Sequence, residues 1–155
     1  MRQQATVGAQ HAAPARLAPK ASRLVRSARI AHLATSDKSG QPHVVPICFA
    51  FDGKYFYSSI DQKPKRTTRL KRLRNIEANP RVALIIDHYD ENWSRLAYVL
   101  AFGTGRILLT GVRHRMAIRA LRRKYRQYRA MDIERRPVIC IQARTIRCWG
   151  DLSSG

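Results

Sequence analysis

The sequence predicts a mainly β fold, an antiparallel barrel with helices packed outside it. Six segments are apolar or alternate in polarity and are rich in β-branched and aromatic residues, as strands are. Only two long segments have helical spacing, and the order of three strands, helix, two strands, helix and strand has too few helices for a parallel doubly wound sheet. At 155 residues the chain has the length of one domain.

The first three strands are expected at 30–35, 42–51 and 54–60, joined by turns at Asp37–Gly40 and Asp52–Gly53. Strands that follow one another across such short turns pair antiparallel, so these three are expected to form a meander. Later strands are expected at 81–89, 95–110 and 137–147. Gly103 and Gly105 are the expected bulge or bend positions.

The first long helix is expected at 64–79, from Pro64 to the residue before Pro80. The second is expected at 113–129, where one apolar stripe follows the helical period. That stripe contains Ile118, Leu121, Tyr125 and Tyr128. A basic stripe lies beside it and contains Arg115, Arg119, Arg122, Arg126 and Arg129.

The domain boundaries follow from changes in composition. Residues 1–27 contain no acid and are expected to be a basic, disordered tail that runs into a short helix at 21–29. Residues 28–150 form the barrel domain, and 151–155 are a C-terminal tail. The acid-free start also resembles an organellar transit peptide, but Pro14 and Pro19 interrupt the amphipathic helix that such a peptide needs.

Localisation is expected to be cytoplasmic. No apolar run approaches the roughly 20 residues of a membrane span, and no signal-peptide core follows the first residues. The three cysteines, an odd number without CxxC spacing, suit a reducing compartment.

Charge points to an anionic partner. The formal net charge is +20, and arginine, whose planar fork pairs with phosphate and carboxylate, supplies 23 of the 30 cations. Two blocks, 63–81 and 113–136, carry +7 and +8. Nonspecific affinity for nucleic acid is therefore expected, although no helix-turn-helix, zinc spacing or RNA-binding aromatic signature is present. His32, His43, His88 and His114 show no metal-ligand spacing, so no metal site is predicted.

Several short motifs carry a family resemblance. They are Leu33–Thr35, Gly40–Pro46, an aromatic strand, a lysine-containing helix and Asn75–Val82. Their order and spacing resemble the FMN-binding split-barrel superfamily, the pyridoxamine 5'-phosphate oxidase-like group. Within it, a subgroup of coenzyme F420-dependent enzymes is similar at four further stretches, Asp61–Lys65, Asp87–Asp90, Asn92–Leu96 and Lys124–Tyr128. The similarity covers about residues 28–149.

The resemblance implies a homodimeric split barrel of six to eight strands with cofactor sites between the subunits. It implies an oxidoreductase that uses coenzyme F420 to transfer a hydride to a small organic acceptor. The cofactor supplies the reacting group in such enzymes, so no catalytic side chain is assigned. FMN is the alternative cofactor, and a non-enzymatic cofactor-binding or nucleic-acid-binding protein is the alternative class.

The resemblance also assigns cofactor-binding residues. The strand beside the cofactor ring maps onto Val45, Pro46, Ile47 and Cys48. The phosphate-binding strand end and following helix map onto Ser58, Ser59, Lys63, Lys65 and Arg66. The residue types suit this role, because hydroxyl donors precede cations at a helix start, where anions are favoured. The alternative is that 63–74 is the solvated face of a helix that packs through its leucines. The arginine stripe of 113–129 has three interpretations, a site for the F420 oligoglutamate tail, a surface remote from it, or a surface that binds nucleic acid.

Removing two of the assigned cations tests the phosphate assignment. The double variant Lys63→Ala, Lys65→Ala is expected to weaken cofactor binding and to leave folding intact, because both positions are expected to be exposed. Titration with the cofactor and thermal denaturation measure the two effects. Unchanged affinity in the folded variant would remove these lysines from the site.

Overall fold

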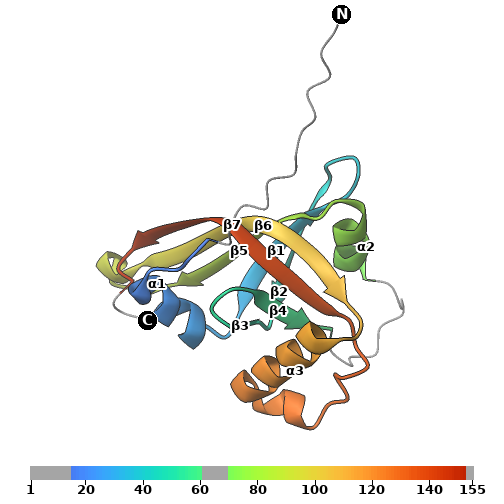
Figure 1. Ribbon diagram of the computed structural model, residues 1–155. Helices are drawn as coiled ribbons and strands as arrows, with labels where there is room; N and C mark the ends of the chain where they lie inside the picture. Colours follow the sequence, from blue (N-terminus) through green and yellow to red (C-terminus); the bar gives the residue numbers. More distant parts are fainter. Residues whose placement is uncertain (1–14, 61–69, 153–155) are drawn as a thin grey trace, which may run out of the picture.

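A computed structural model describes residues 15–60 and 70–152 and contains one sheet of seven strands with three α-helices (Figure 1). The strands are β1 Ala31–Ser36, β2 Pro42–Ile47, β3 Ala50–Phe51, β4 Phe56–Ser59, β5 Arg81–His88, β6 Ala97–Leu108 and β7 Val138–Gly150. The helices are α1 Pro19–Ser27, α2 Lys71–Ala78 and α3 Val112–Lys124, with short 3-10 helices η1 Trp93–Arg95 and η2 Arg126–Arg129. Within the described part of the chain, no helix is both long and apolar enough to cross a membrane.

The strand order is β2-β1-β5-β6-β7-β4-β3, and every neighbouring pair is antiparallel. The sheet curves into a half-barrel, as Figure 1 shows. The predicted fold class, a mainly β split barrel of six to eight antiparallel strands with flanking helices, is confirmed.

The predicted strand at 42–51 is wrong in one respect, because it is two strands. β2 pairs with β1, whereas β3 pairs with β4 at the opposite edge of the sheet. The first three strands therefore form no meander. The break falls at Cys48 and Phe49, where the Phe49 amide donates its hydrogen bond to the Tyr125 hydroxyl instead of to a neighbouring strand (3.0 Å).

The prediction of one continuous helix at 113–129 is also wrong, because the segment is interrupted at Tyr125. α3 ends at Lys124, and Tyr125 has an extended backbone (φ −121°, ψ 115°) before η2 begins. The helix predicted at 64–79 is described only from residue 70 on, and there α2 begins at Lys71 and ends at Ala78. The segment 61–69, with Lys63, Lys65 and Arg66, lies outside the described residues.

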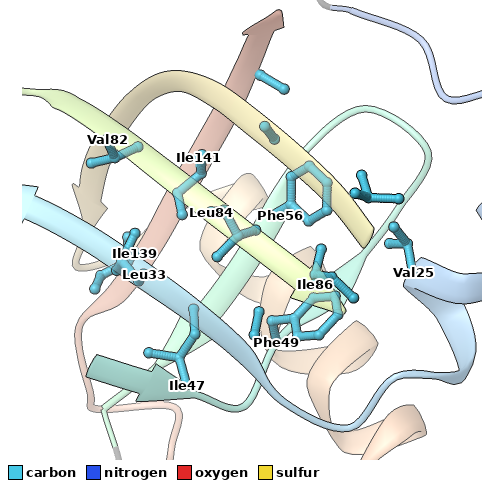
Figure 2. Packing of buried hydrophobic residues seen from close by; sticks show 14 of the residues in the cluster. Val25, Leu33, Ile47, Phe49, Phe56, Val82, Leu84, Ile86, Ile139 and Ile141 are labelled. Atoms are coloured by element: carbon cyan, nitrogen blue, oxygen red, sulfur yellow. The ribbon is translucent and has the colours of Figure 1, made fainter. Parts of the chain in front are cut away.

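Two buried clusters hold the fold together. The main core lies inside the curve of the sheet, where apolar residues of β1, β2, β4, β5 and β7 meet (Figure 2). The expected short helix in the N-terminal segment is α1, and its Ala21, Leu24 and Val25 are buried in this core. The second cluster packs the apolar stripe of α3 against β4 and β7, through Leu121, Tyr57 and Cys140 among others.

A close approach of β6 and β7 depends on Gly103. The register of this pair shifts between Phe102 and Gly103, so that Arg144 of β7 is an extra residue. A β-carbon at position 103 would lie 2.0 Å from the carbonyl oxygen of Gln142 on β7. Gly103 is thus a bulge position, as predicted. Gly105 faces Val82 and Ile76, whose side-chain carbons would lie 3.3–3.4 Å from an added β-carbon.

Alanine at these two glycines is expected to have different effects. Gly103→Ala should lower the free energy of unfolding by about 2 kcal/mol or more, because backbone would have to move. Gly105→Ala should cost less than about 1 kcal/mol, because only flexible side chains must adjust. Urea denaturation of both variants measures the difference, and equal losses would contradict the proposed cause.

Candidate functional site

The ends of β2 and β4 face each other across a pocket of about 240 Å³. Its lining, which we call the β2–β4 pocket, consists of Ile30, Pro46, Ile47, Cys48, Ser58, Ser59, Arg72 and Tyr128. The sheet brings these distant segments together because its curvature turns β4 back toward β2. Five of the nine residues assigned from the sequence line this one pocket.

Pairing with β7 fixes the serine side of the β2–β4 pocket. Ser58 lies opposite Ile139 and Ser59 opposite Val138, and the ladder continues with a hydrogen bond from the Ile60 amide to the Pro137 carbonyl. Both serines are buried. Ser59 Oγ donates to the Ile60 carbonyl at 3.4 Å, a long contact, so both hydroxyls remain suited to an acceptor such as a phosphate oxygen.

The other side of the pocket is held by Tyr125. Its hydroxyl accepts from the Phe49 amide and lies 2.7 Å from the Arg29 carbonyl and 2.9 Å from the Phe49 carbonyl, either of which can accept its proton. Burial raises the pKa of the Tyr125 phenol, so the hydroxyl keeps that proton at neutral pH. This clamp fixes the bend that directs the chain from Cys48, in the pocket, to β3.

Arg72 supplies the cation of the β2–β4 pocket. It lies in the first turn of α2, and α2 lies near enough to β2 for Lys71 and Arg72 to affect His43. Burial first, and then these two positive charges, lower the pKa of His43, so His43 is neutral at neutral pH. Among the described lining residues, Arg72 carries the positive charge, and none is an acid or a histidine.

Sequence reasoning missed three lining residues. Arg72 belongs to the basic block 63–81, but nothing in that block distinguishes it from its neighbours. Tyr128 was expected on the apolar stripe of a continuous helix, and the break at Tyr125 redirects it. Ile30 was expected to begin the first strand, and nothing in the sequence marked it as a site residue.

The other assigned residues are placed elsewhere or not described. Val45 packs against the main core and does not line the pocket. Lys63, Lys65 and Arg66 lie outside the described residues, so their part in the site stays a prediction.

Known proteins share both the sequence pattern and the fold. The family profile of pyridoxamine 5'-phosphate oxidase matches residues 17–150. No curated protein sequence matches the chain.

Among solved structures, a conserved hypothetical protein from Mycobacterium tuberculosis is 21% identical with a TM-score of 0.67, over 93% of this chain and 91% of that one. The heme storage protein HutZ from Vibrio cholerae is 14% identical with a TM-score of 0.68, over 88% and 95% of the two chains. An FAD-binding protein from Mesorhizobium loti is 19% identical with a TM-score of 0.64, over 86% and 95%.

The TM-scores show that these proteins share the fold of this chain, and at such low sequence identities the similarity shows the fold alone. The family profile extends over most of the sequence, including both strands that end at the β2–β4 pocket. The chain therefore belongs to the pyridoxamine 5'-phosphate oxidase family.

Proposed function

We propose that the protein is an oxidoreductase that binds coenzyme F420 in the β2–β4 pocket and transfers a hydride to a small organic acceptor. The observation that carries this proposal is the meeting of Pro46–Cys48 with Ser58 and Ser59 in one pocket. The family resemblance assigned these two segments to opposite ends of one cofactor. Their meeting in space supports that assignment.

The residues present fit a cofactor with a phosphate and a flat ring. Two buried serine hydroxyls and the Arg72 guanidinium are donors that suit phosphate oxygens. Pro46 and Ile47 offer apolar surface for a ring. The pocket is small for a whole deazaflavin, so the rest of the cofactor would lie outside the described lining.

The chain's own residues would bind and orient rather than react. When bound, F420 supplies the hydride. The described lining has no carboxylate or imidazole that could act as an acid or base near neutral pH. The serines and Arg72 would hold the phosphate end, while Pro46 and Ile47 would cover one face of the ring and exclude water from it.

A second copy of the chain would complete the site. β2 is an edge strand, and its Pro42, Val44 and Pro46 are exposed. Ile30, at the pocket, is 52% exposed and Val44 is 60% exposed. Exposed apolar side chains on an edge strand and beside a pocket are typical of a surface that is buried against another protein chain. We therefore propose a homodimer with the pocket beside its interface.

FMN is the alternative cofactor, since it shares the ribityl phosphate arm and would use the same serines and arginine. The Mesorhizobium loti structure, a protein described as FAD-binding, supports a flavin in this fold.

Titration of the purified protein with F420 and with FMN, followed by fluorescence at two salt concentrations, tests the proposal. Saturable, tighter binding of F420 that survives moderate salt is expected, because ring contacts are not screened by ions. Preference for FMN would make the protein a flavin enzyme. Binding of neither cofactor beyond what salt abolishes would defeat the oxidoreductase proposal.

A matched pair of arginine variants tests the pocket itself. Arg72→Met should weaken cofactor binding by about tenfold or more, because a hydrogen bond between charged groups is worth roughly 1.5–3 kcal/mol. Arg147→Met removes the same charge from an exposed position of β7 outside the pocket and should leave the affinity unchanged. Equal losses in both variants would mean that net charge, and not the pocket, attracts the cofactor.

A further inference from the structure

A second, larger groove lies between α1, the β3–β4 turn and α3. It consists of two adjoining pockets of about 340 and 480 Å³, both lined by Arg26 and Phe51. β3 lies between α1 and α3 (Figure 1), so one strand forms the floor that the two helices flank. None of its lining residues lines the β2–β4 pocket. We call it the α1–α3 groove.

Cations dominate the lining of the α1–α3 groove. They come from the N-terminal segment, from α1, from the β3–β4 turn and from α3. They are Arg16, Arg26, Lys54, Arg123 and Lys124. Such a concentration of positive charge in a concave surface favours an anionic ligand.

The one acid among the groove's described lining residues is Asp52, and the turn already uses it. Its carboxylate accepts hydrogen bonds from the amides of Lys54 and Tyr55, both at 2.8 Å, and from the Tyr57 hydroxyl at 2.6 Å. Asp52 is therefore held in the β3–β4 turn, and its single negative charge is outnumbered by the five cations of the groove.

The cations keep donors available. Within the described residues, Arg123 makes no hydrogen bond or ion pair, and Arg26 bonds through Nε alone, to Ser22 Oγ (3.3 Å). Lys124 Nζ donates to the Val25 carbonyl at 3.4 Å and lies 3.8 Å from the centre of the Phe49 ring.

An aromatic ring lies where the two pockets join. Phe51 lines both, and its ring packs on Phe56 with a centroid distance of 4.5 Å, which fixes its position. Ala50 and Ala120 add apolar surface to the first pocket. A ligand that suits this lining has several negative charges next to a flat ring.

We propose that the α1–α3 groove binds a nucleoside diphosphate, with its base on Phe51 and its phosphates on Arg26, Arg123 and Lys124. This site is separate from the proposed cofactor pocket and does not depend on it. Guanidinium groups pair with phosphate oxygens through two N–H donors, and the purine or pyrimidine ring gains contact area on the aromatic floor.

ADP is the probe, with adenosine and inorganic pyrophosphate as controls, and calorimetric titration as the measurement. ADP is expected to bind saturably and at least tenfold more tightly than either control, because each control lacks one half of the contacts. No saturable ADP binding, or pyrophosphate binding as tight as ADP binding, would overturn the proposal.

Two sets of variants locate the site. Arg26→Met with Arg123→Met should weaken ADP binding by tenfold or more, whereas Arg115→Met with Arg119→Met removes the same charge from exposed positions of α3 outside the groove and should not. Phe51→Leu should weaken ADP binding but leave pyrophosphate binding unchanged. Equal effects of the two double variants would contradict the site. F420 or FMN affinity, measured on the protein with Arg26→Met and Arg123→Met, should not change.

The pH dependence gives an independent readout. Burial first, and then the Arg29 charge, lower the pKa of Lys124 to about 8. The charged or titratable groups around it are Arg26, Arg29, Cys48, Asp52, Arg123 and Tyr125. Since a lysine with this pKa is mostly protonated at pH 7 and mostly neutral at pH 9, ADP affinity should fall by about tenfold over that interval. Lys124→Arg should remove this dependence, and an unchanged profile in that folded variant would exclude Lys124 from the site.

Discussion

The pairing of β6 with β7 is the interaction on which the rest of this structure depends. β7 lies between β6 and β4, so it joins the group β2-β1-β5-β6 to the short hairpin of β3 and β4. The register shift at Gly103 sits inside this long pair, and a bulge at such a position bends a strand and increases its twist. That bend turns the sheet into a half-barrel and carries Ser58 and Ser59 toward the end of β2. The β2–β4 pocket is thus a consequence of how two strands far from it in the sequence approach each other.

Tyr125 also connects parts of the chain that are distant in the sequence. Its hydroxyl bonds Phe49 and lies within hydrogen-bond distance of the Arg29 carbonyl, and its extended backbone ends α3. Phe49 lies between Cys48, which lines the β2–β4 pocket, and Ala50, which lines the α1–α3 groove, and Tyr125 follows Lys124 of the same groove. A buried phenol can hold both positions only while it keeps its proton, and burial ensures this by raising its pKa.

The sequence predicted the positions of those strands that depend on local pattern. It did not predict the chain breaks that depend on contacts between distant residues. Alternating apolar residues located β1, β5, β6 and β7 within a few residues, and the glycine in β6 marked the bulge. The break at Phe49 was missed because its hydrogen-bond partner is 76 residues away. The end of α3 at Lys124 was missed for the same reason, since the apolar stripe continues through Tyr125 and Tyr128. At the candidate site, the resemblance located the two segments that meet, but Arg72 and Tyr128 become neighbours only through the fold.

The positive charge of the α1–α3 groove affects both the stability of the fold and the binding of the proposed anionic ligand. Among the residues that the structure describes, the surface ion pairs, such as Arg122 with Glu134 and Arg135 with Asp132, involve none of the groove cations. Burying a positive charge opposes folding. Burial, and then the Arg29 charge, lower the pKa of Lys124, so the folded state binds this proton less tightly than the unfolded state does. Without a ligand, that cost is present in full below pH 8 and is relieved as the pH rises from about 8 toward the ordinary lysine value. A bound anion would act in the opposite sense, because it favours the protonated amine and binds only the folded state. The same side chains would then stabilise the fold at neutral pH only when an anion occupies the groove.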